Sequence, residues 1–210
     1  MDSHAHLIGP CQDRSVASLA MTELDLSRAV LLTIDLQQGF DEPSWPLRWN
    51  KQMDANGLAL IAEWRATGRP IIHVRHDSVE SGSTLTPGTV GNNFRPGFGP
   101  QGDEPLITKS VNSAFIGTDL DLRLKRLGAR HVIAFGISTD QCVSTTIRTG
   151  ANMGWDMVLV PDACDCFGLP DGNGGTISAE DIQAAHVAPL KFEFCRSLST
   201  EQLIEARKAA

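Results

Sequence analysis

The chain has 210 residues, of which 41% are hydrophobic and 20% are charged, and its formal net charge is −7. That length and apolar content are sufficient for a single domain with a sizeable core. The acidic balance argues against nucleic acid or an anionic membrane surface as a partner. No apolar run is long enough to span a bilayer, and the first residues do not resemble a signal peptide, so we expect a cytoplasmic protein.

The order of the predicted elements indicates one α/β domain at residues 28–210, preceded by an N-terminal arm at residues 1–27. Apolar runs of strand length alternate with helical stretches, which is typical of a Rossmann-like, three-layer parallel β-sheet flanked by helices on both faces. The expected strands are Ala29–Ile34, Ile71–Arg75, Leu106–Thr108, His131–Gly136, Asp156–Val160 and Phe192–Leu198. The expected helices are Lys51–Ala66, Thr118–Leu127, Gln141–Met153, Ser178–Leu190 and Thr200–Ala209.

One segment interrupts this alternation. Residues 77–101 are rich in Gly, Pro, Ser and Thr and are too long for a plain connection. Loops of this length are usually lids, binding loops or subunit contacts. We therefore expect this loop to border either a substrate site or a second subunit.

Three reactive side chains follow strands of the predicted sheet. Asp35 follows the first strand, Lys109 follows Leu106–Thr108, and Cys142 lies just past His131–Gly136. In doubly wound sheets, sites form beyond the carboxyl ends of the strands. We therefore expect the three side chains to meet at one edge of the sheet.

The position of Cys142 predicts a nucleophile. It opens the expected helix CVSTTIRTGANMG, and a thiol at the positive end of a helix dipole and near Lys109 is expected to have a lowered pKa. Cys142 would attack a carbonyl carbon, while Asp35 takes the thiol proton and passes it to the leaving nitrogen. Lys109 would keep Asp35 ionised and favour the thiolate. Backbone N–H groups at the helix start would stabilise the oxyanion.

Three separated segments resemble the isochorismatase-like cysteine hydrolases, a family that includes nicotinamidases and N-carbamoylsarcosine amidases. They are TIDLQQGF around Asp35, TKSVNSAFIGTDLDLRL around Lys109, and GISTDQCVSTTIRTGANMGWDMVLVPDAC around Cys142. The resemblance implies that these residues form a catalytic triad in a homodimer or homotetramer. It further implies a cis peptide at Ile137–Ser138, with the backbone N–H groups of Ser138 and Cys142 as the oxyanion hole.

The stretch after the second strand bears on a metal site. Family members that cleave nicotinamide bind a metal through an Asp and several His residues in this region. Here His73 and His76 are followed only by Glu80, and the pattern resembles the streptothricin-hydrolase and carbamoylsarcosine-amidase-like branch. Because a closed site needs more ligands, we do not expect a metal. The proposed chemistry also implies no organic cofactor.

Side chains near the predicted triad are candidates for binding a small amide substrate. They are Gln38, Phe40, Trp45, His76 and Phe115. Aromatic residues that directly follow Asp35 can form the wall of a substrate pocket, although the same residues can equally belong to the core. His73 lies inside an apolar strand, so we expect it to be a hydrogen-bonded core residue.

The predicted activity is hydrolysis of a small amide or carbamoyl C–N bond through a cysteine thioester. One alternative is a vinyl-ether hydrolase of the isochorismatase type, which does not need the cysteine nucleophile. Another is a thiol redox sensor, for which Cys164 or Cys166 would have to resolve an oxidised Cys142. The five scattered cysteines do not form a disulfide framework, and we expect Cys164, Cys166 and Cys195 to be small buried residues.

Overall fold

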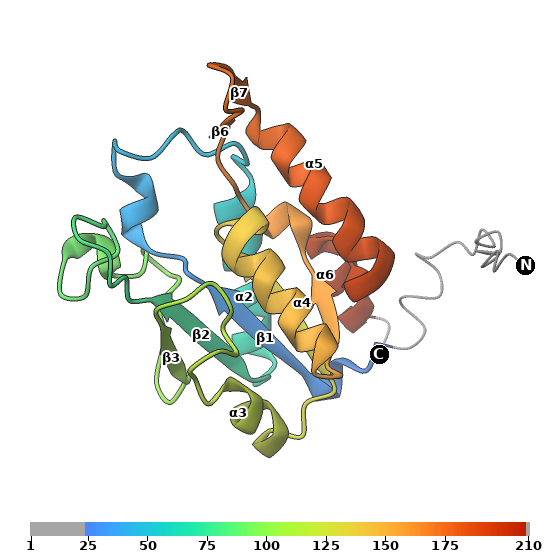
Figure 1. Cartoon of the computed structure of the whole chain (residues 1–210). Coiled ribbons are helices and arrows are strands. Elements are labelled where there is room, and N and C mark those ends of the chain that lie inside the picture. Colours follow the sequence, from blue (N-terminus) through green and yellow to red (C-terminus); the bar gives the residue numbers. More distant parts are fainter. Residues whose placement is uncertain (1–23, 209–210) are drawn as a thin grey trace, which may run out of the picture.

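A six-stranded parallel sheet forms the centre of the computed structural model, which describes residues 24–208 (Figure 1). The strands lie in the order β3-β2-β1-β4-β5-β8. Their bounds are β1 Ala29–Ile34, β2 Ile71–His76, β3 Leu106–Lys109, β4 His131–Gly136, β5 Asp156–Leu159 and β8 Arg196–Ser197. Every residue of β1 and β4 is buried, which explains why these strands read as unbroken apolar runs.

Helices cover both faces of the sheet, which confirms the predicted fold class. Figure 1 shows α4 and α5 on one face and α2 and α6 on the other. The bounds are α2 Met53–Ala66, α3 Leu120–Arg126, α4 Ser144–Asn152, α5 Ala179–Pro189 and α6 Thr200–Lys208. The side chain of Ser178 accepts a hydrogen bond from the Asp181 N–H and so begins α5, as the sequence predicts. None of the helices in residues 24–208 is long and apolar enough to cross a membrane.

The order of the strands indicates where in the sheet a functional site is expected. The chain builds outward from β1 to β2 and β3, and then returns to the other side of β1 with β4. Such a reversal leaves a crevice beyond the carboxyl ends of the two central strands. Asp35 directly follows β1, and the turn that leads to Cys142 follows β4.

The segment after α5 differs from the expected strand at Phe192–Leu198. A π-turn occupies Leu190–Phe194, and only the two residues of β8 pair with β5. The Cys195 N–H donates to the Leu190 carbonyl, so the helical path continues past the end of α5. Phe192, with which the expected strand begins, is 83% exposed, so its apolar side chain does not belong to a buried strand. A small hairpin, β6 (Leu169–Pro170) with β7 (Thr176–Ile177), also lies outside the predicted elements.

Residues 1–23 of the predicted arm lie outside the described residues. The part of the arm that is described packs against the domain, since Leu26 is buried and Leu24 contacts the core. The Asp25 N–H donates to His131 Nε2 over 3.2 Å. The packed structure therefore begins a few residues before Arg28.

Candidate active site

The structure brings Asp35, Lys109 and Cys142 together at the carboxyl edge of the sheet. Lys109 Nζ lies 2.5 Å from Asp35 Oδ2 and 3.4 Å from Cys142 Sγ. Both side chains of the Asp35–Lys109 pair are buried, and Cys142 is 7% exposed. Lys109 lies on β3, two strands away from β1. Its long side chain passes the end of β2 and so reaches Asp35 and Cys142.

The backbone around Asp35 is shaped by the close approach of β1 and β4. Asp35 has a φ of 53°, in the left-handed region that non-glycine residues rarely adopt. Next to it, Gly136 has a φ of 149°, and a Cβ at this position would lie 2.0 Å from the Ile34 carbonyl oxygen. Only glycine therefore fits at the end of β4. Asp35 Oδ1 is buried and has no hydrogen-bond partner in the described part of the chain.

Cys142 lies in a π-turn, Thr139–Val143, that precedes α4. The Ser138 carbonyl accepts from the N–H groups of Gln141 and Val143, so two hydrogen bonds to this carbonyl shape the turn that carries Cys142. The predicted cis peptide at Ile137–Ser138 is confirmed. Within residues 24–208 the Ser138 N–H has no acceptor. Single π-turns inside helices are frequent at functional sites.

The pKa of the Cys142 thiol differs from the sequence-based expectation. Burial and then the neighbouring Asp35 carboxylate raise this pKa well above its ordinary value, against the opposing effect of Lys109. Burial also raises the pKa of the Asp35 carboxyl, which makes it a stronger proton acceptor. The expected lowered thiol pKa is therefore wrong, because removal from water outweighs the helix and the lysine. The resting cysteine is a neutral thiol beside a buried base.

His76 lies beside these three residues, and we refer to Asp35, His76, Lys109 and Cys142 as the cluster. Lys109 Nζ lies 3.2 Å from His76 Nδ1. Burial and then Lys109 lower the pKa of His76. Because an ammonium can only donate, Nδ1 of the neutral ring accepts and Nε2 carries the proton. His73, by contrast, contacts Thr33 and Glu104 inside the protein, as expected for a core residue.

Asp35, His76 and Cys142 each offer a ligand atom, and these atoms lie within 4.8 Å of one another, as a metal site would need. However, Lys109 Nζ contacts all three side chains, so an ammonium already occupies the centre of the cluster. A second cation there would be repelled by the lysine. The residues present therefore do not fit a metal ion.

A cavity of about 210 Å³ borders the cluster. Its walls include Phe40, Trp45 and His76, three of the predicted substrate-binding residues. Loop 77–101 contributes five further residues, so it forms one wall of the cavity. Apart from Asp35 and Cys142, the other lining residues are Ser78, Val79, Glu80, Ser83, Leu85, Ser110, Asn112 and Gln141.

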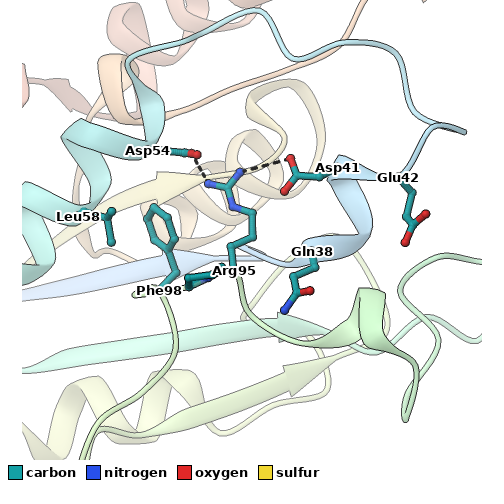
Figure 2. Close-up of a pocket in the computed structure, with 8 residues that line it drawn as sticks. Gln38, Asp41, Glu42, Asp54, Leu58, Arg95 and Phe98 are labelled. Carbon is teal, nitrogen blue, oxygen red and sulfur yellow. Dashed lines mark hydrogen bonds and ion pairs between the residues drawn. The ribbon is translucent and has the colours of Figure 1, made fainter.

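Two other predicted pocket residues do not line this cavity. Gln38 lies in a 3₁₀ turn, donates to the Phe94 carbonyl over 3.0 Å, and faces a separate hollow beside Arg95 (Figure 2). Phe115 is buried in the core, where its ring lies over Gly150 of α4. The absence of a side chain at Gly150 leaves space for the ring, which therefore turns away from the cavity.

Gln37, the neighbour of Gln38, is the structural residue that the sequence analysis missed. It is fully buried, and its Nε2 donates to the carbonyls of His76 and Asn92. Its Oε1 accepts from the His76 N–H over 2.8 Å. Gln37 thus links the end of β1 to the end of β2 and to loop 77–101. Nothing in the local sequence distinguishes it from Gln38.

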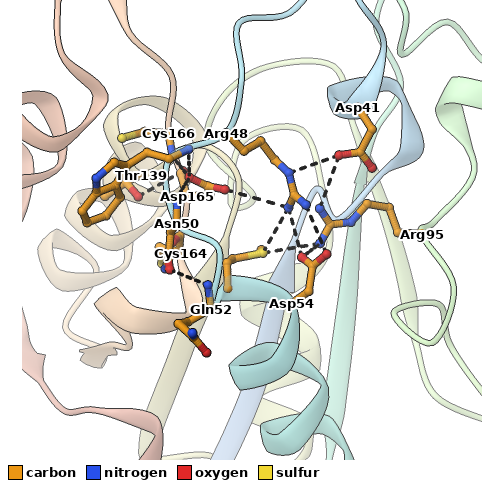
Figure 3. A network of polar contacts seen from close by, with 12 residues as sticks. Asp41, Arg48, Asn50, Gln52, Asp54, Arg95, Thr139, Cys164, Asp165 and Cys166 are labelled. Carbon is orange, nitrogen blue, oxygen red and sulfur yellow. Dashed lines mark hydrogen bonds and ion pairs between the residues drawn. The ribbon is translucent and has the colours of Figure 1, made fainter.

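Asp165 links two other segments of the site. Its Oδ1 accepts from the N–H groups of Trp49 and Asn50, and its carbonyl accepts from the Thr139 N–H. Figure 3 shows this residue between Arg48 and the Thr139 turn. The segment that carries the pocket residue Trp45 is thereby held against the turn that carries Cys142.

Comparisons with known proteins agree with this geometry. The isochorismatase domain family matches residues 29–174. The uncharacterised isochorismatase family protein YrdC of Bacillus subtilis is 36% identical over 177 residues, which cover 84% of this chain and 95% of YrdC. A crystal structure of a putative hydrolase of the isochorismatase family from Chromobacterium violaceum superposes with a TM-score of 0.85 at 37% identity, covering 89% of this chain and 97% of that one. A streptothricin hydrolase of Streptomyces noursei is 25% identical over 140 residues, 67% of this chain and 50% of that protein. The chain therefore belongs to the isochorismatase-like cysteine hydrolase family.

Proposed function

We propose that this hydrolase cleaves the C–N bond of a small amide or carbamoyl compound through a thioester on Cys142. The observation that carries the proposal is the position of Lys109 Nζ, 2.5 Å from Asp35 Oδ2 and 3.4 Å from Cys142 Sγ, beside a cavity. A nucleophile, a base and a fixed positive charge are thus within reach of one bound carbonyl group.

The first half of the reaction forms the thioester. Asp35 accepts the Cys142 proton, and the sulfur attacks the carbonyl carbon to give a tetrahedral oxyanion. When this intermediate collapses, the C–N bond breaks and Asp35 returns the proton to the leaving nitrogen. The raised pKa of the Asp35 carboxyl favours the first transfer, since it narrows the difference in proton affinity between this carboxylate and the Cys142 thiolate.

The second half releases the acid. Water enters the space of the departed amine, Asp35 accepts one of its protons, and the oxygen attacks the thioester carbonyl. Collapse of the second tetrahedral intermediate breaks the C–S bond, and the proton on Asp35 restores the Cys142 thiol. The enzyme returns to its starting protonation state, and one water is consumed for each amide cleaved.

The N–H groups of Ser138 and Cys142 are the proposed oxyanion donors. Two observations support this role: the Ser138 N–H has no acceptor among the described residues, and Cys142 lies in the π-turn that directly follows Ser138. Two converging amide donors are the usual means of stabilising such an intermediate. Lys109 adds a positive charge in a site from which water is excluded, where charge has a larger effect than in solvent.

The alternatives predict different behaviour. Cleavage of a vinyl ether would break a carbon–oxygen bond and release neither ammonia nor an amine. A redox sensor would need a reactive second thiol, but Cys164 and Cys166 are buried and burial raises the pKa of each to about 12. The presence of Cys142 in the wall of the cavity favours the amide reaction.

An ammonia-release screen over small amides, ureido acids and lactams tests the proposal, with Cys142→Ser as the control. Mass spectrometry of the quenched reaction should show Cys142 carrying the acyl group of the substrate. Full turnover by Cys142→Ser would contradict the proposal, as would an active enzyme that never carries an acyl group. The homodimeric or homotetrameric assembly and the cytoplasmic location stay predictions, which light scattering and cell fractionation can test.

A further inference from the structure

We propose that the cavity selects amides that carry a positively charged group, recognised by Glu80 together with the aromatic wall of Phe40 and Trp45. The inference rests on the proposed amide hydrolysis and adds the chemical class of its substrate. Three features of the cavity support it: its unbalanced charge, its aromatic surface and the neutral character of its other polar groups.

The charge of the lining residues is unbalanced. Within residues 24–208 they include two carboxylates, Asp35 and Glu80, and no lysine or arginine. The Asp35 charge is matched by Lys109, which contacts it from behind the cavity wall. Glu80 lies on the exposed part of loop 77–101 and forms no ion pair with the residues that the structure describes. The carboxylate at the mouth therefore gives the cavity a net negative charge, which attracts cations and repels anions.

The aromatic wall suits the same kind of ligand. The ring centroids of Phe40 and Trp45 are 5.0 Å apart, and Trp45 packs on Phe167 at 4.9 Å. Trp45 Nε1 donates to Thr84 Oγ1 over 3.0 Å, which fixes the indole against the loop that carries Glu80. Ammonium and guanidinium groups are attracted to aromatic faces, and most strongly to that of tryptophan.

The other polar side chains of the lining are neutral. They are Ser78, Ser83, Ser110, Asn112, Gln141 and the neutral ring of His76. These groups can hydrogen-bond an amide but offer no positive charge to bind a carboxylate. With the carbonyl group at Cys142, the rest of the ligand extends toward Phe40, Trp45 and Glu80, where a cationic end group would lie.

Charged thiol reagents test the selectivity without a known substrate. The rates of Cys142 modification by 2-(trimethylammonio)ethyl and 2-sulfonatoethyl methanethiosulfonate are compared, each divided by its rate with free 2-mercaptoethanol. We expect the cationic reagent to be favoured, and Glu80→Gln to reduce the ratio about two- to fivefold, the range for a partly exposed charge. Glu205→Gln on α6 changes the net charge equally at an exposed site and should leave the ratio unchanged. An unchanged ratio in Glu80→Gln, or an equal change in Glu205→Gln, would overturn the inference.

Matched amides test binding in the cavity. Protection of Cys142 against iodoacetamide is compared for 4-aminobutanamide, pentanamide and glutaramate, which differ in the charge of the end group. The cationic amide should protect best, and Glu80→Gln should remove its advantage over the neutral one. If the cationic amide protects no better than the neutral one, the inference is wrong. Neither readout needs turnover, so failure here is distinguishable from failure of the proposed hydrolysis, which the acyl-enzyme test decides.

Discussion

Lys109 donates to Asp35 across 2.5 Å in an ion pair whose two side chains are fully buried. Because Cys142 Sγ lies 3.4 Å from the same ammonium, the pair and the thiol form one electrostatic unit. Transfer of the thiol proton to Asp35 moves the negative charge from oxygen to sulfur without changing the net charge around Lys109. The buried site can therefore generate a thiolate without creating an unpaired charge.

Replacing Asp35 by Asn should separate thiol reactivity from turnover. The Asp35 charge raises the pKa of the Cys142 thiol and Lys109 lowers it, so Asp35→Asn should lower this pKa. Iodoacetamide labelling of Cys142 at pH 7 should then accelerate roughly tenfold for each unit of pKa. Turnover should nevertheless fall by about 10²- to 10⁴-fold, because the proton acceptor is lost.

Peptide mapping across pH 6 to about 10 measures the labelling, with Asp171→Asn in an exposed loop as the matched control. Slower labelling of Asp35→Asn would show that Asp35 favours the thiolate in the resting enzyme. Retained turnover in this variant would exclude Asp35 as the base.

Removing the charge of Lys109 should destabilise the fold. Lys109→Met leaves the Asp35 carboxylate buried without its partner, which typically costs about 3–5 kcal/mol. The double variant Asp35→Asn, Lys109→Met has no buried charge at this position and should recover much of that loss. Urea unfolding of the four proteins measures the coupling, and additive effects of the two substitutions would contradict the interpretation.

Gln37 should stabilise loop 77–101, which forms one wall of the cavity, although Gln37 itself does not line the cavity. Gln37→Leu removes the donor to the Asn92 carbonyl and the acceptor of the His76 N–H, at a cost of about 1–3 kcal/mol, while the His76 carbonyl keeps its hydrogen bond from Asn92 Nδ2. Hydrogen exchange should therefore accelerate in residues 76–93. Gln38→Leu is the matched control, since Gln38 is half-buried and makes one contact to the Phe94 carbonyl. Equal exchange in the two variants would show that Gln37 does not hold the loop.

The Arg65–Glu104–His73 cluster should contribute to acid unfolding. Hydrogen bonding to Arg65 is the largest cause that lowers the pKa of Glu104 to about 2. A carboxyl with a lowered folded-state pKa stabilises the protein above its unfolded pKa, and this contribution is lost as the pH falls toward the folded value. The free energy of unfolding should therefore decrease from about pH 4.5 toward pH 2. In Glu104→Gln the decrease should be smaller, as measured by urea titrations at stepped pH, and an identical slope would contradict the assignment.

The reaction should not depend on a metal ion. Lys109 Nζ contacts the three side chains that could bind one, so prolonged dialysis against a chelator should leave turnover and the rate of Cys142 labelling unchanged. Added zinc should not raise the unfolding temperature. Activity lost on dialysis and restored by zinc or iron would show that the lysine moves aside for a metal.

The local sequence was sufficient to predict an element where a single continuous run of apolar residues forms it. β1 and β4 have the predicted bounds because six consecutive residues are buried in each, which is typical of a strand covered on both sides. The segment at 192–198 shows the limit, since Phe192 and Phe194 belong to a π-turn in which Phe192 is exposed. Whether an apolar residue pairs with a neighbouring strand depends on how elements distant in the sequence pack together. The hydrophobic periodicity of a segment carries no information about that packing.

The same distinction holds within the site. Asp35, Lys109 and Cys142 could be predicted to meet because each lies at or just past the end of a strand, and parallel strands end at one edge. Gln37 and Gln38 have the same side chain, yet one is buried against loop 77–101 and the other faces the hollow beside Arg95. Adjacent positions point in different directions, so only the fold assigns their roles.

By itself, the sequence determined the fold class through its apolar runs and indicated the family through three separated motifs. It also predicted that Asp35, Lys109 and Cys142 meet, because residue types at strand ends are local properties of the chain. Only the tertiary structure decided the state of Cys142, the cavity wall and the residues that hold it. The thiol pKa depends on how completely water is excluded and on the separation of charges from β1, β3 and the turn after β4. These are distances between segments remote in sequence, and they exist only once the chain has folded.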